Sequence, residues 1–128
     1  MTYLLDTHTF LWYIRDDQAL TAKARALIAD VQNTVFLSIA SVWEISIKVS
    51  LGKLTLPDPY DQFIYEQVRT NRFTLYPISV EHTAVVAGLP YHHRDPFDRL
   101  IIAQALADDL AIIGNDVIFD RYGITRYW

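Results

Sequence analysis

The sequence lacks several features that would assign it to a common class of protein. Its 128 residues include no cysteine, which excludes disulfide scaffolds and thiolate metal sites and fits a reducing compartment. No apolar run approaches the roughly 18–20 residues that a membrane-spanning helix needs. The first residues carry neither the basic segment nor the small-residue cleavage site of a signal peptide. We therefore expect a cytoplasmic protein with no membrane partner.

Glycine and basic residues are also scarce. Only four glycines are present, and none follows the first apolar segment in the spacing of a dinucleotide-binding loop, which excludes that class of enzyme. Fifteen acidic residues outnumber eleven Lys and Arg, giving a formal charge of −4, so no overall basic field attracts nucleic acid. Such a partner has to be bound through a local basic patch or through bound cations.

What the chain does have is enough apolar material for one compact domain. Hydrophobic residues make up 52% of the chain and charged residues only 20%, so a sizeable core can form and disorder is excluded. We find no repeat, no low-complexity segment and no linker. A single domain over residues 1–128 is therefore expected.

Short apolar runs alternate with helical patterns along the chain. The expected strands are residues 3–5, 35–37, 74–76, 111–113 and, last, 124–126. Caps and apolar spacing predict helices after Asp6, from Thr21 to Asp30, from Ser38 or Ser41 towards Gly52, from Asp58-Pro59 to about Arg72, from Ser79 to Gly88 and from Asp95-Pro96 to Ala107. Short strands without polar alternation, separated by helices, predict a three-layer α/β sandwich around a parallel sheet of four to five strands.

Four carboxylates fall at positions that this fold brings to one edge of the sheet. Asp6 and Asp116 each follow a predicted strand closely, and ligands of open parallel sheets bind beyond the carboxyl ends of the strands. Glu44 lies in the first turns of the helix after the second strand, and Asp98 in the first turn of the helix before the fourth. Right-handed crossovers bring all four to the same edge.

Four carboxylates without basic neighbours repel one another, so they require either raised pKa values or bound hard cations. Oxygen ligands alone favour Mg²⁺ or Mn²⁺. Such a site lowers the pKa of a bound water and neutralises the leaving oxygen of a phosphodiester. The pattern therefore predicts hydrolysis of a nucleic acid backbone.

Two of the acids also have a purely structural interpretation in their local sequence. Asp98 lies three residues after Asp95 in a pattern that caps a helix, and the same pattern occurs at Asp58–Asp61. Glu44 and Lys48 are four residues apart, as in an ion pair on a helix surface. The apolar neighbours of Glu44 favour a largely buried helix instead, where a carboxylate needs a purpose.

The other two acids, Asp6 and Asp116, can each cap the helix that follows.

Histidine is a further type of metal ligand, although a polar surface or capping role is the commoner one. The histidines in question are His8, His92 and His93.

Four short segments carry a resemblance to a known family. They are Leu4–Thr7, Ser41–Ile45 followed by Lys48, Asp95–Ala103, and Asn115–Asp116. Their order and spacing resemble the acidic motifs of the PIN domain and, more closely, those of the VapC-type toxins of prokaryotic toxin–antitoxin pairs. The resemblance covers essentially the whole chain. A single motif of this kind is weak, but four in order on a matching alternation of strands and helices are specific.

The resemblance implies a PIN-like fold and a Mg²⁺- or Mn²⁺-dependent endoribonuclease that acts on RNA. Its acidic cluster would be Asp6, Glu44, Asp98 and Asp116. The resemblance also implies a small antitoxin protein that covers the site, and a homodimer. One departure is Gly114, which stands where many members of the family carry the hydroxyl of Thr or Ser, two residues before the last acid.

Basic residues near the third motif are candidates for contact with substrate phosphates. Arg94 and Arg99 flank the Asp98 motif, and arginine suits phosphate geometry. Arg99 can equally pair with Asp95. Weaker candidates for phosphate contact are Lys48, Arg121 and Arg126.

Within the cluster, we expect Asp6 and Asp98 to bind the metal directly. Glu44 and Asp116 would position water, complete the coordination of a second ion or act as the base, and the sequence does not choose among these roles.

The sequence also allows two other functions: an RNA-processing nuclease without an antitoxin, and a degenerate domain that binds RNA or a protein. A surface that only binds a polyanion gains nothing from clustered negative charge, so metal binding distinguishes an enzyme from that last class.

Overall fold

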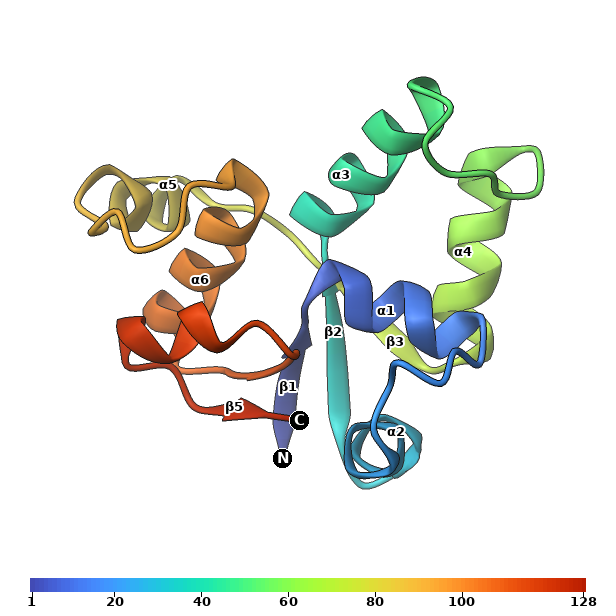
Figure 1. Ribbon diagram of the computed structural model, residues 1–128, viewed down its shortest axis with the longest axis horizontal. Helices are drawn as coiled ribbons and strands as arrows, with labels where there is room; N and C mark the ends of the chain where they lie inside the picture. The colour runs from blue at the N-terminus through green and yellow to red at the C-terminus, as the bar shows by residue number, and fades with distance from the viewer.

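The computed structural model describes residues 1–128, in which strands and helices alternate (Figure 1). The strands are β1 (Thr2–Leu5), β2 (Thr34–Ser38), β3 (Phe73–Tyr76), β4 (Ala111–Ile113) and β5 (Arg126–Tyr127). The helices are α1 (Thr7–Ile14), α2 (Ala22–Ala29), α3 (Ile39–Ser50), α4 (Tyr60–Thr70), α5 (Val80–Ala87), α6 (Pro96–Asp108) and a short 3₁₀ helix, η1 (Val117–Tyr122). None of the helices is long and apolar enough to cross a membrane.

The five strands form one parallel sheet in the order β3-β2-β1-β4-β5. The central strand is β1, whose Leu4 lies opposite Phe36 of β2 and Ile112 of β4. The chain builds the sheet outwards from β1 through β2 to β3, then returns to the other side of β1 for β4 and β5. The chain connections therefore lead away from each other on the two sides of the boundary between β1 and β4. Open parallel sheets bind ligands at such a boundary, beyond the carboxyl ends of the strands.

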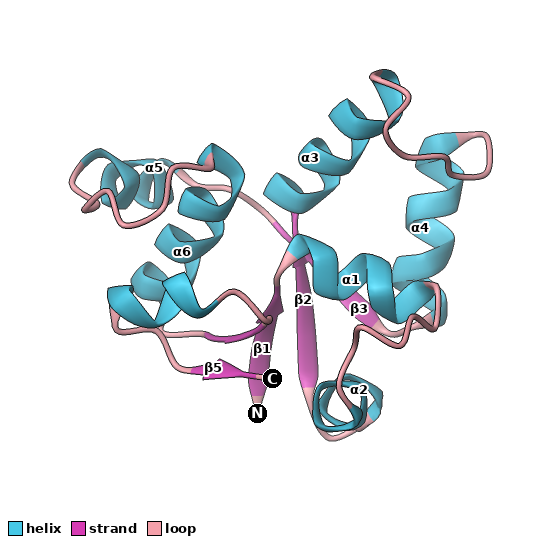
Figure 2. Ribbon diagram, in the orientation of Figure 1, coloured by secondary structure: helices cyan, strands magenta, loops and turns pink.

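Both faces of the sheet are buried under helices (Figure 2). Alternate residues of a strand point to opposite faces, and β1 shows this directly. Tyr3 and Leu5 belong to a cluster of 12 buried hydrophobic residues that includes side chains of α1 and α2. Leu4 belongs to a second cluster of nine, with side chains of α6 and β4. The expected three-layer α/β sandwich with a parallel sheet is therefore confirmed.

The last strand begins later than its sequence pattern indicates. The sequence predicts a strand over residues 124–126, but β5 consists of Arg126 and Tyr127. Ile124 is buried in the second core cluster, and the carbonyl of Thr125 already accepts a hydrogen bond from the amide of Ile112. Ile124 therefore packs into the core, and hydrogen bonding to β4 begins at Thr125, one residue before β5.

Two identical sequence patterns form different helix starts. Asp95 caps α6, because its carboxylate accepts hydrogen bonds from the amides of Phe97 and Asp98, at 2.8 and 3.0 Å. The expectation that Pro59 opens α4 as its first residue is wrong: the helix begins at Tyr60, with Pro59 as the flanking residue and no side-chain cap. The Asp-Pro-aromatic-Asp pattern therefore does not determine the cap by itself.

Candidate active site

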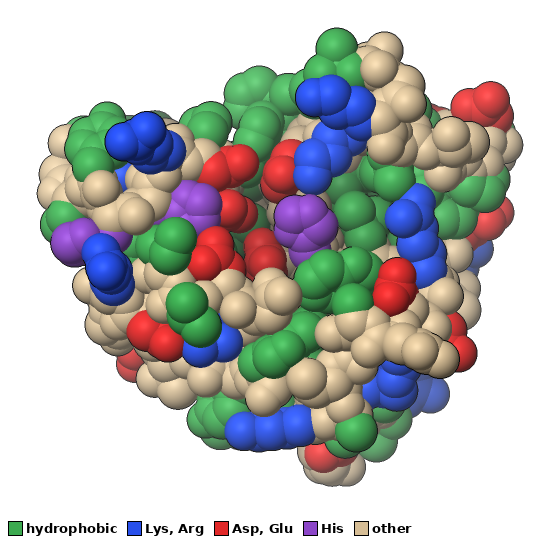
Figure 3. All heavy atoms as spheres, viewed as in Figure 1, with side chains coloured by type: hydrophobic (Ala, Val, Ile, Leu, Met, Phe, Trp, Pro, Cys, Tyr) green, Lys and Arg blue, Asp and Glu red, His purple; other side chains and the backbone are tan.

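The four acids lie on four different elements at the carboxyl edge of the sheet. Asp6 directly follows β1 and caps α1, with 2.8 Å between its carboxylate and the amide of Thr7. Glu44 is on α3 and Asp98 is the third residue of α6. Asp116 follows β4 and caps η1 through the amide of Ile118. Figure 3 shows acidic side chains gathered in a hollow between the two sides of the molecule.

The four acids are close enough to act on one another electrostatically. Burial raises the pKa of Asp98 to about 8, and repulsion from Asp6, Asp95, Glu44 and Asp116 adds to this rise. Burial also raises the pKa of Asp6 to about 6, although His8 and the amide of Thr7 counteract it. The metal-free cluster therefore holds protons that ordinary aspartates would release.

Glu44 is buried, and only one of its two carboxylate oxygens has a polar partner. One carboxylate oxygen, Oε2, lies 3.3 Å from Nζ of Lys48, so the ion pair expected from their spacing is present. The other oxygen, Oε1, is buried without a hydrogen-bond partner. Only 7% of the residue is exposed, so this ion pair is not a feature of the surface. A buried acceptor without a partner is costly, and a bound cation would satisfy it.

His93 joins the cluster, whereas the sequence favoured a surface or capping role for it. Its Nε2 lies 2.8 Å from Oδ2 of Asp116 and 3.0 Å from Oδ2 of Asp98. Its Nδ1 accepts a hydrogen bond from the amide of Asp95, so the proton of the neutral ring is on Nε2, facing both carboxylates. The contact of His93 with the amide of Asp95 could be predicted from the sequence, because His93 precedes the helix cap by two residues. The link to Asp116 depends on the tertiary fold.

The other two candidate histidines take different positions. His8 is exposed, and its ring packs against that of Trp12 with 5.6 Å between centroids. His92 is also exposed and packs edge-on against Tyr122, at 5.1 Å. Neither histidine belongs to the group of possible metal ligands that lie within 4.8 Å of one another, which consists of His93, Asp98 and Asp116.

The two arginines that flank Asp98 differ in role. Arg99 is 5% exposed, and its guanidinium donates hydrogen bonds to the backbone carbonyls of Leu89, Pro90 and His93, at 2.9–3.2 Å. These bonds take the place of the expected pair with Asp95. Arg94 is exposed. Contact of either arginine with a substrate phosphate stays a prediction. Arg126 pairs with Asp120 through two bonds, at 2.8 and 2.9 Å.

Gly114 lies against Asp6 where β4 ends. A Cβ atom at position 114 would lie 2.9 Å from Cβ of Asp6, which is closer than real Cβ contacts allow. Threonine or serine, which the resemblance leads us to expect at this position, would bring the same Cβ. Gly114 therefore permits the close approach of Asp6.

Gly114→Ala is expected to destabilise the protein by about 1–3 kcal/mol, because a buried contact must open at a strand end. The matched control is Gly88→Ala, since nothing lies within 4 Å of a Cβ at position 88 and Gly88 has an ordinary negative φ. Urea unfolding in chelator measures both variants. Equal stability of the two would contradict the close approach.

The chemistry of the donor set fits a hard divalent cation. Carboxylate oxygens are the ligands that Mg²⁺ and Mn²⁺ prefer, and four carboxylates meet here with an unpartnered oxygen on Glu44. A cation would also offset the burial and the repulsion that together raise the pKa of Asp98. Asp6 and Asp98 are the two acids whose pKa values are raised. Ligand atoms of Asp98 also lie within 4.8 Å of those of Asp116 and His93.

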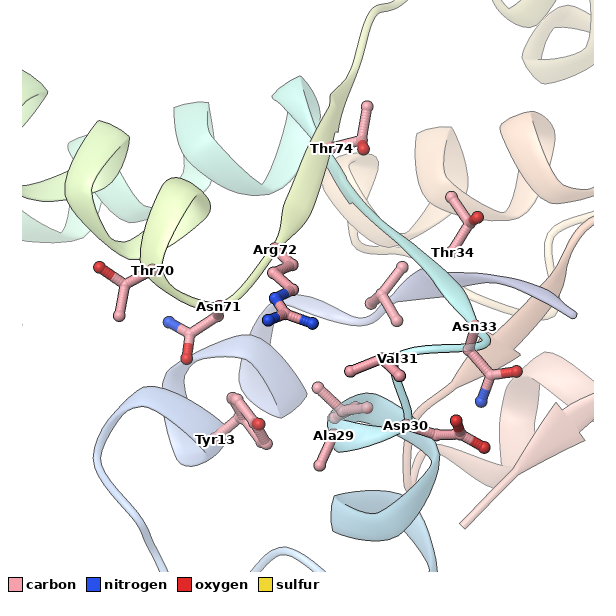
Figure 4. Close-up of a pocket in the computed structure, with 12 residues that line it drawn as sticks. Tyr13, Ala29, Asp30, Val31, Asn33, Thr34, Thr70, Asn71, Arg72 and Thr74 are labelled. Atoms are coloured by element: carbon pink, nitrogen blue, oxygen red, sulfur yellow. The ribbon is translucent and has the colours of Figure 1, made fainter.

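A separate cavity lies at the opposite end of the sheet, where β2 and β3 begin (Figure 4). Its volume is about 390 Å³, and its lining carries both signs of charge, from Asp30 and Arg72. Arg72 points into it (Figure 4). The cavity contains neither a cluster of acids nor a cluster of bases, and none of the four acids of the site lines it.

The fold and the site define a class of protein: a parallel α/β domain with an acidic cluster at the carboxyl ends of its strands. Comparison with known proteins identifies the family. The family model for the PIN domain matches residues 3–124. The chain therefore belongs to the PIN domain family.

One curated relative is Ribonuclease VapC16 of Mycobacterium tuberculosis, which is 42% identical over 60 residues. This match covers 47% of the chain, and the chain spans 41% of the length of that relative. The stretch matched to this relative is therefore about half of the chain, while the family match covers nearly all of it.

Solved structures match the whole fold. VapBC2 from Rickettsia felis, bound to a DNA fragment from its promoter, gives a TM-score of 0.69 at 20% identity and covers 99% of this chain and 98% of that one. FitAcB from Neisseria gonorrhoeae gives 0.66 at 19% identity, with 100% and 97% covered. VapBC-1 from nontypeable Haemophilus influenzae gives 0.67 at 16% identity, with 99% and 97% covered. At these identities the likeness establishes the fold.

Proposed function

We propose that this protein is a metal-dependent endoribonuclease that hydrolyses RNA phosphodiester bonds, and that it is the toxin of a type II toxin–antitoxin pair acting in the cytoplasm. The observation that carries the proposal is the cluster of four carboxylates at the carboxyl ends of the strands, with pKa values of Asp6 and Asp98 raised to about 6 and 8. Membership of the PIN family and the likeness to a protein named as a ribonuclease support it.

The cofactor in this proposal is Mg²⁺ or Mn²⁺, since PIN-domain ribonucleases generally depend on divalent metals. When bound, such an ion supplies Lewis acidity to the attacking water and to the phosphodiester. Asp6 and Asp98 would hold the ion, and Glu44 or Asp116 would orient the water or accept its proton. His93 fixes the oxygens of Asp98 and Asp116 through Nε2. Arg94 is exposed beside the cluster and binds a substrate phosphate.

The partners in this proposal are a small antitoxin protein and a second copy of the chain. Exposed apolar side chains on α3 and α4 support a protein partner. Trp43 is 57% exposed and Tyr65 is 61% exposed, which is unusual for such large side chains. Between these helices a groove of about 120 Å³ is lined mainly by hydrophobic residues, among them Val42, Ile64 and Leu75.

Asp6→Asn is expected to reduce metal-dependent cleavage roughly 100-fold or more, the scale that follows loss of one charge-stabilising group. The fold should survive, because asparagine has nearly the same volume and caps a helix as well as aspartate does. The measurement is cleavage of a mixed pool of structured and unstructured RNA with Mg²⁺, with Mn²⁺ and with chelator.

The control for Asp6→Asn is Asp61→Asn, which makes the same change of charge at an exposed position on α4. Its activity should equal that of the parent. Cleavage that persists in chelator, or in Asp6→Asn, would contradict the proposed chemistry. Metal binding without any cleavage would favour the degenerate binding domain. Cleavage by a protein that no small co-encoded partner inhibits would favour the RNA-processing nuclease.

A further inference from the structure

A basic pocket opens beside the acidic cluster, between α1 and the turn that follows α3. Its volume is about 260 Å³. We use the term basic pocket for the cavity lined by His8, Leu11, Trp12, Arg15, Lys48, Lys53 and Leu54. Three of its seven lining residues are Lys or Arg, a fourth is histidine, and none is acidic. In a chain with a net charge of −4, this is a marked local reversal of sign.

The positive charges of the basic pocket are largely uncompensated. Lys48 pairs with Glu44, at 3.3 Å. Arg15 and Lys53 are exposed, and the ion pairs of the molecule include neither of them. Two free cationic side chains that line one cavity attract an anionic ligand, and a phosphate group suits arginine and lysine together.

The basic pocket also has an aromatic wall. Trp12 is half-buried and contacts two other rings, with centroid distances of 5.6 Å to His8 and 5.7 Å to Trp128. A fixed tryptophan beside cationic side chains is the combination by which proteins bind single-stranded nucleic acid, the ring stacking on a base and the cations binding the backbone.

The basic pocket and the acidic cluster share a boundary. His8 lies two residues after Asp6 on the same helix start, and the ion pair of Lys48 with Glu44 joins the two sites directly. Figure 3 shows a histidine and Lys or Arg side chains beside the hollow that contains the acidic ones. A chain whose phosphodiester lies at the acids can therefore continue into the pocket.

We propose that the basic pocket binds the nucleotide next to the cleaved phosphodiester, with its phosphate near Arg15 and Lys53 and its base against Trp12. The inference rests on the proposed function and adds to it a binding site for one nucleotide. A base can reach Trp12 only when it is unpaired, so the nucleotide in the pocket is single-stranded and its base is free to stack.

The first test removes the two free charges in the variant Arg15→Gln/Lys53→Gln. Binding of fluorescein-labelled hexauridine is measured in Mg²⁺ at several salt concentrations, with Asp6→Asn as the common background to prevent cleavage. We expect Kd to rise roughly tenfold at low salt. The slope of log K against log salt should fall by about 1.4, which is two contacts at roughly 0.7 each. In the active protein, KM should rise while kcat stays the same.

The matched control is Lys23→Gln/Arg69→Gln, which removes the same two kinds of charge. Lys23 is on α2 and Arg69 is near the end of α4, and both segments lead into the amino ends of strands, away from the acids (Figure 1). Both residues are exposed. This control should keep the Kd and the salt slope of its background protein.

The second test concerns the base. Trp12→Leu should weaken hexauridine binding roughly tenfold but leave the binding of an abasic hexamer unchanged, since stacking requires a base. The abasic probe also reports whether the variant is folded. A duplex of the same length should bind weakly to the parent and equally weakly to Trp12→Leu.

Several outcomes would overturn the inference, and they separate it from the proposed function. If the parent cleaves RNA but the Arg15/Lys53 variant keeps the parental KM and salt slope, the pocket is not a substrate site and the nuclease stands. If hexaglutamate competes for the pocket as well as hexauridine does, the pocket serves an acidic protein. If the parent neither binds nor cleaves RNA in any metal, both proposals are wrong.

Discussion

Asp98→Asn should make the metal-free protein more stable while abolishing its activity. Burial and three neighbouring acids of the cluster raise the pKa of Asp98 to about 8, so its ionised form is unfavourable in the folded protein. An unfolded chain returns this group to an ordinary pKa near 4. Asparagine has nearly the same volume and removes the unfavourable charge. The cost of ionisation at this position therefore disappears.

The pH dependence of stability follows from the same difference in pKa. Between about pH 4 and pH 8 the folded protein retains a proton on Asp98 that the unfolded chain has released, so the free energy of unfolding falls as the pH rises. Asp6, with its pKa near 6, adds to this fall between about pH 4 and pH 6. The parent should therefore be more stable at pH 5 than at pH 8 when no metal is present.

The gain from Asp98→Asn should be largest at pH 8 and above. With a discount for partial solvent access, we expect on the order of 2–3 kcal/mol. In a domain of this size that corresponds to a rise in Tm of roughly 10 °C. Thermal unfolding in chelator at pH 5 and pH 8 measures it, with the exposed Asp61→Asn as the control that changes the same charge.

Added Mg²⁺ should stabilise the parent much more than the variant. A ligand that binds only the folded state stabilises it, so the Tm of the parent should rise with the Mg²⁺ concentration. Asp98→Asn should gain little, because one of the proposed ligands is missing. A variant that is less stable than the parent in chelator would show that the carboxylate of Asp98 is structural.

Arg99→Met is expected to cost roughly 3 kcal/mol or more of the free energy of unfolding. The substitution keeps the length of the side chain but removes every donor. The carbonyls of Leu89 and His93 lose their bonds to the guanidinium, and the carbonyl of Pro90 keeps only the hydroxyl of Tyr122. Each buried carbonyl left without a hydrogen bond costs about 1–3 kcal/mol. The face of the Tyr91 ring, 3.9 Å from the guanidinium, also loses its cation.

The matched variant is Arg94→Met, five residues earlier and exposed. Its stability should stay within about 0.5 kcal/mol of the parent, while the salt slope of RNA binding falls by about 0.7. Urea unfolding and hexauridine binding, measured on both variants, separate the two roles. An Arg99→Met protein of parental stability with weakened RNA binding would restore the substrate role that the sequence suggested for Arg99.

The position of the acids could be predicted because it depends on strand ends and chain order. Asp6 and Asp116 follow parallel strands, and the handedness of crossovers sends Glu44 and Asp98 to the same edge. These constraints are local or topological, so a single sequence contains them. The same holds for the sheet, whose short apolar strands lie between helices in a regular alternation.

What the sequence did not reveal depends on contacts between distant segments. Arg99 and Arg94 have similar chemistry and neighbouring positions, yet only the fold places the carbonyls of residues 89–93 around one of them. His93 meets Asp116 only after the chain has passed through α6 and β4. Asp58 and Asp95 begin identical patterns, but only Asp95 caps its helix, so the surrounding structure decides.

The order of the strands also sets when the acids can meet during synthesis. The first strand made is β1, the centre of the sheet, and it carries Asp6 into place with only one neighbour until β4 appears more than a hundred residues later. The loop between β4 and η1 is then held by the final strand, through Arg126 on the carbonyl of Gly114. A ribosome that is still making residues 117–127 therefore carries a chain with all four carboxylates but without the support that holds the last of them.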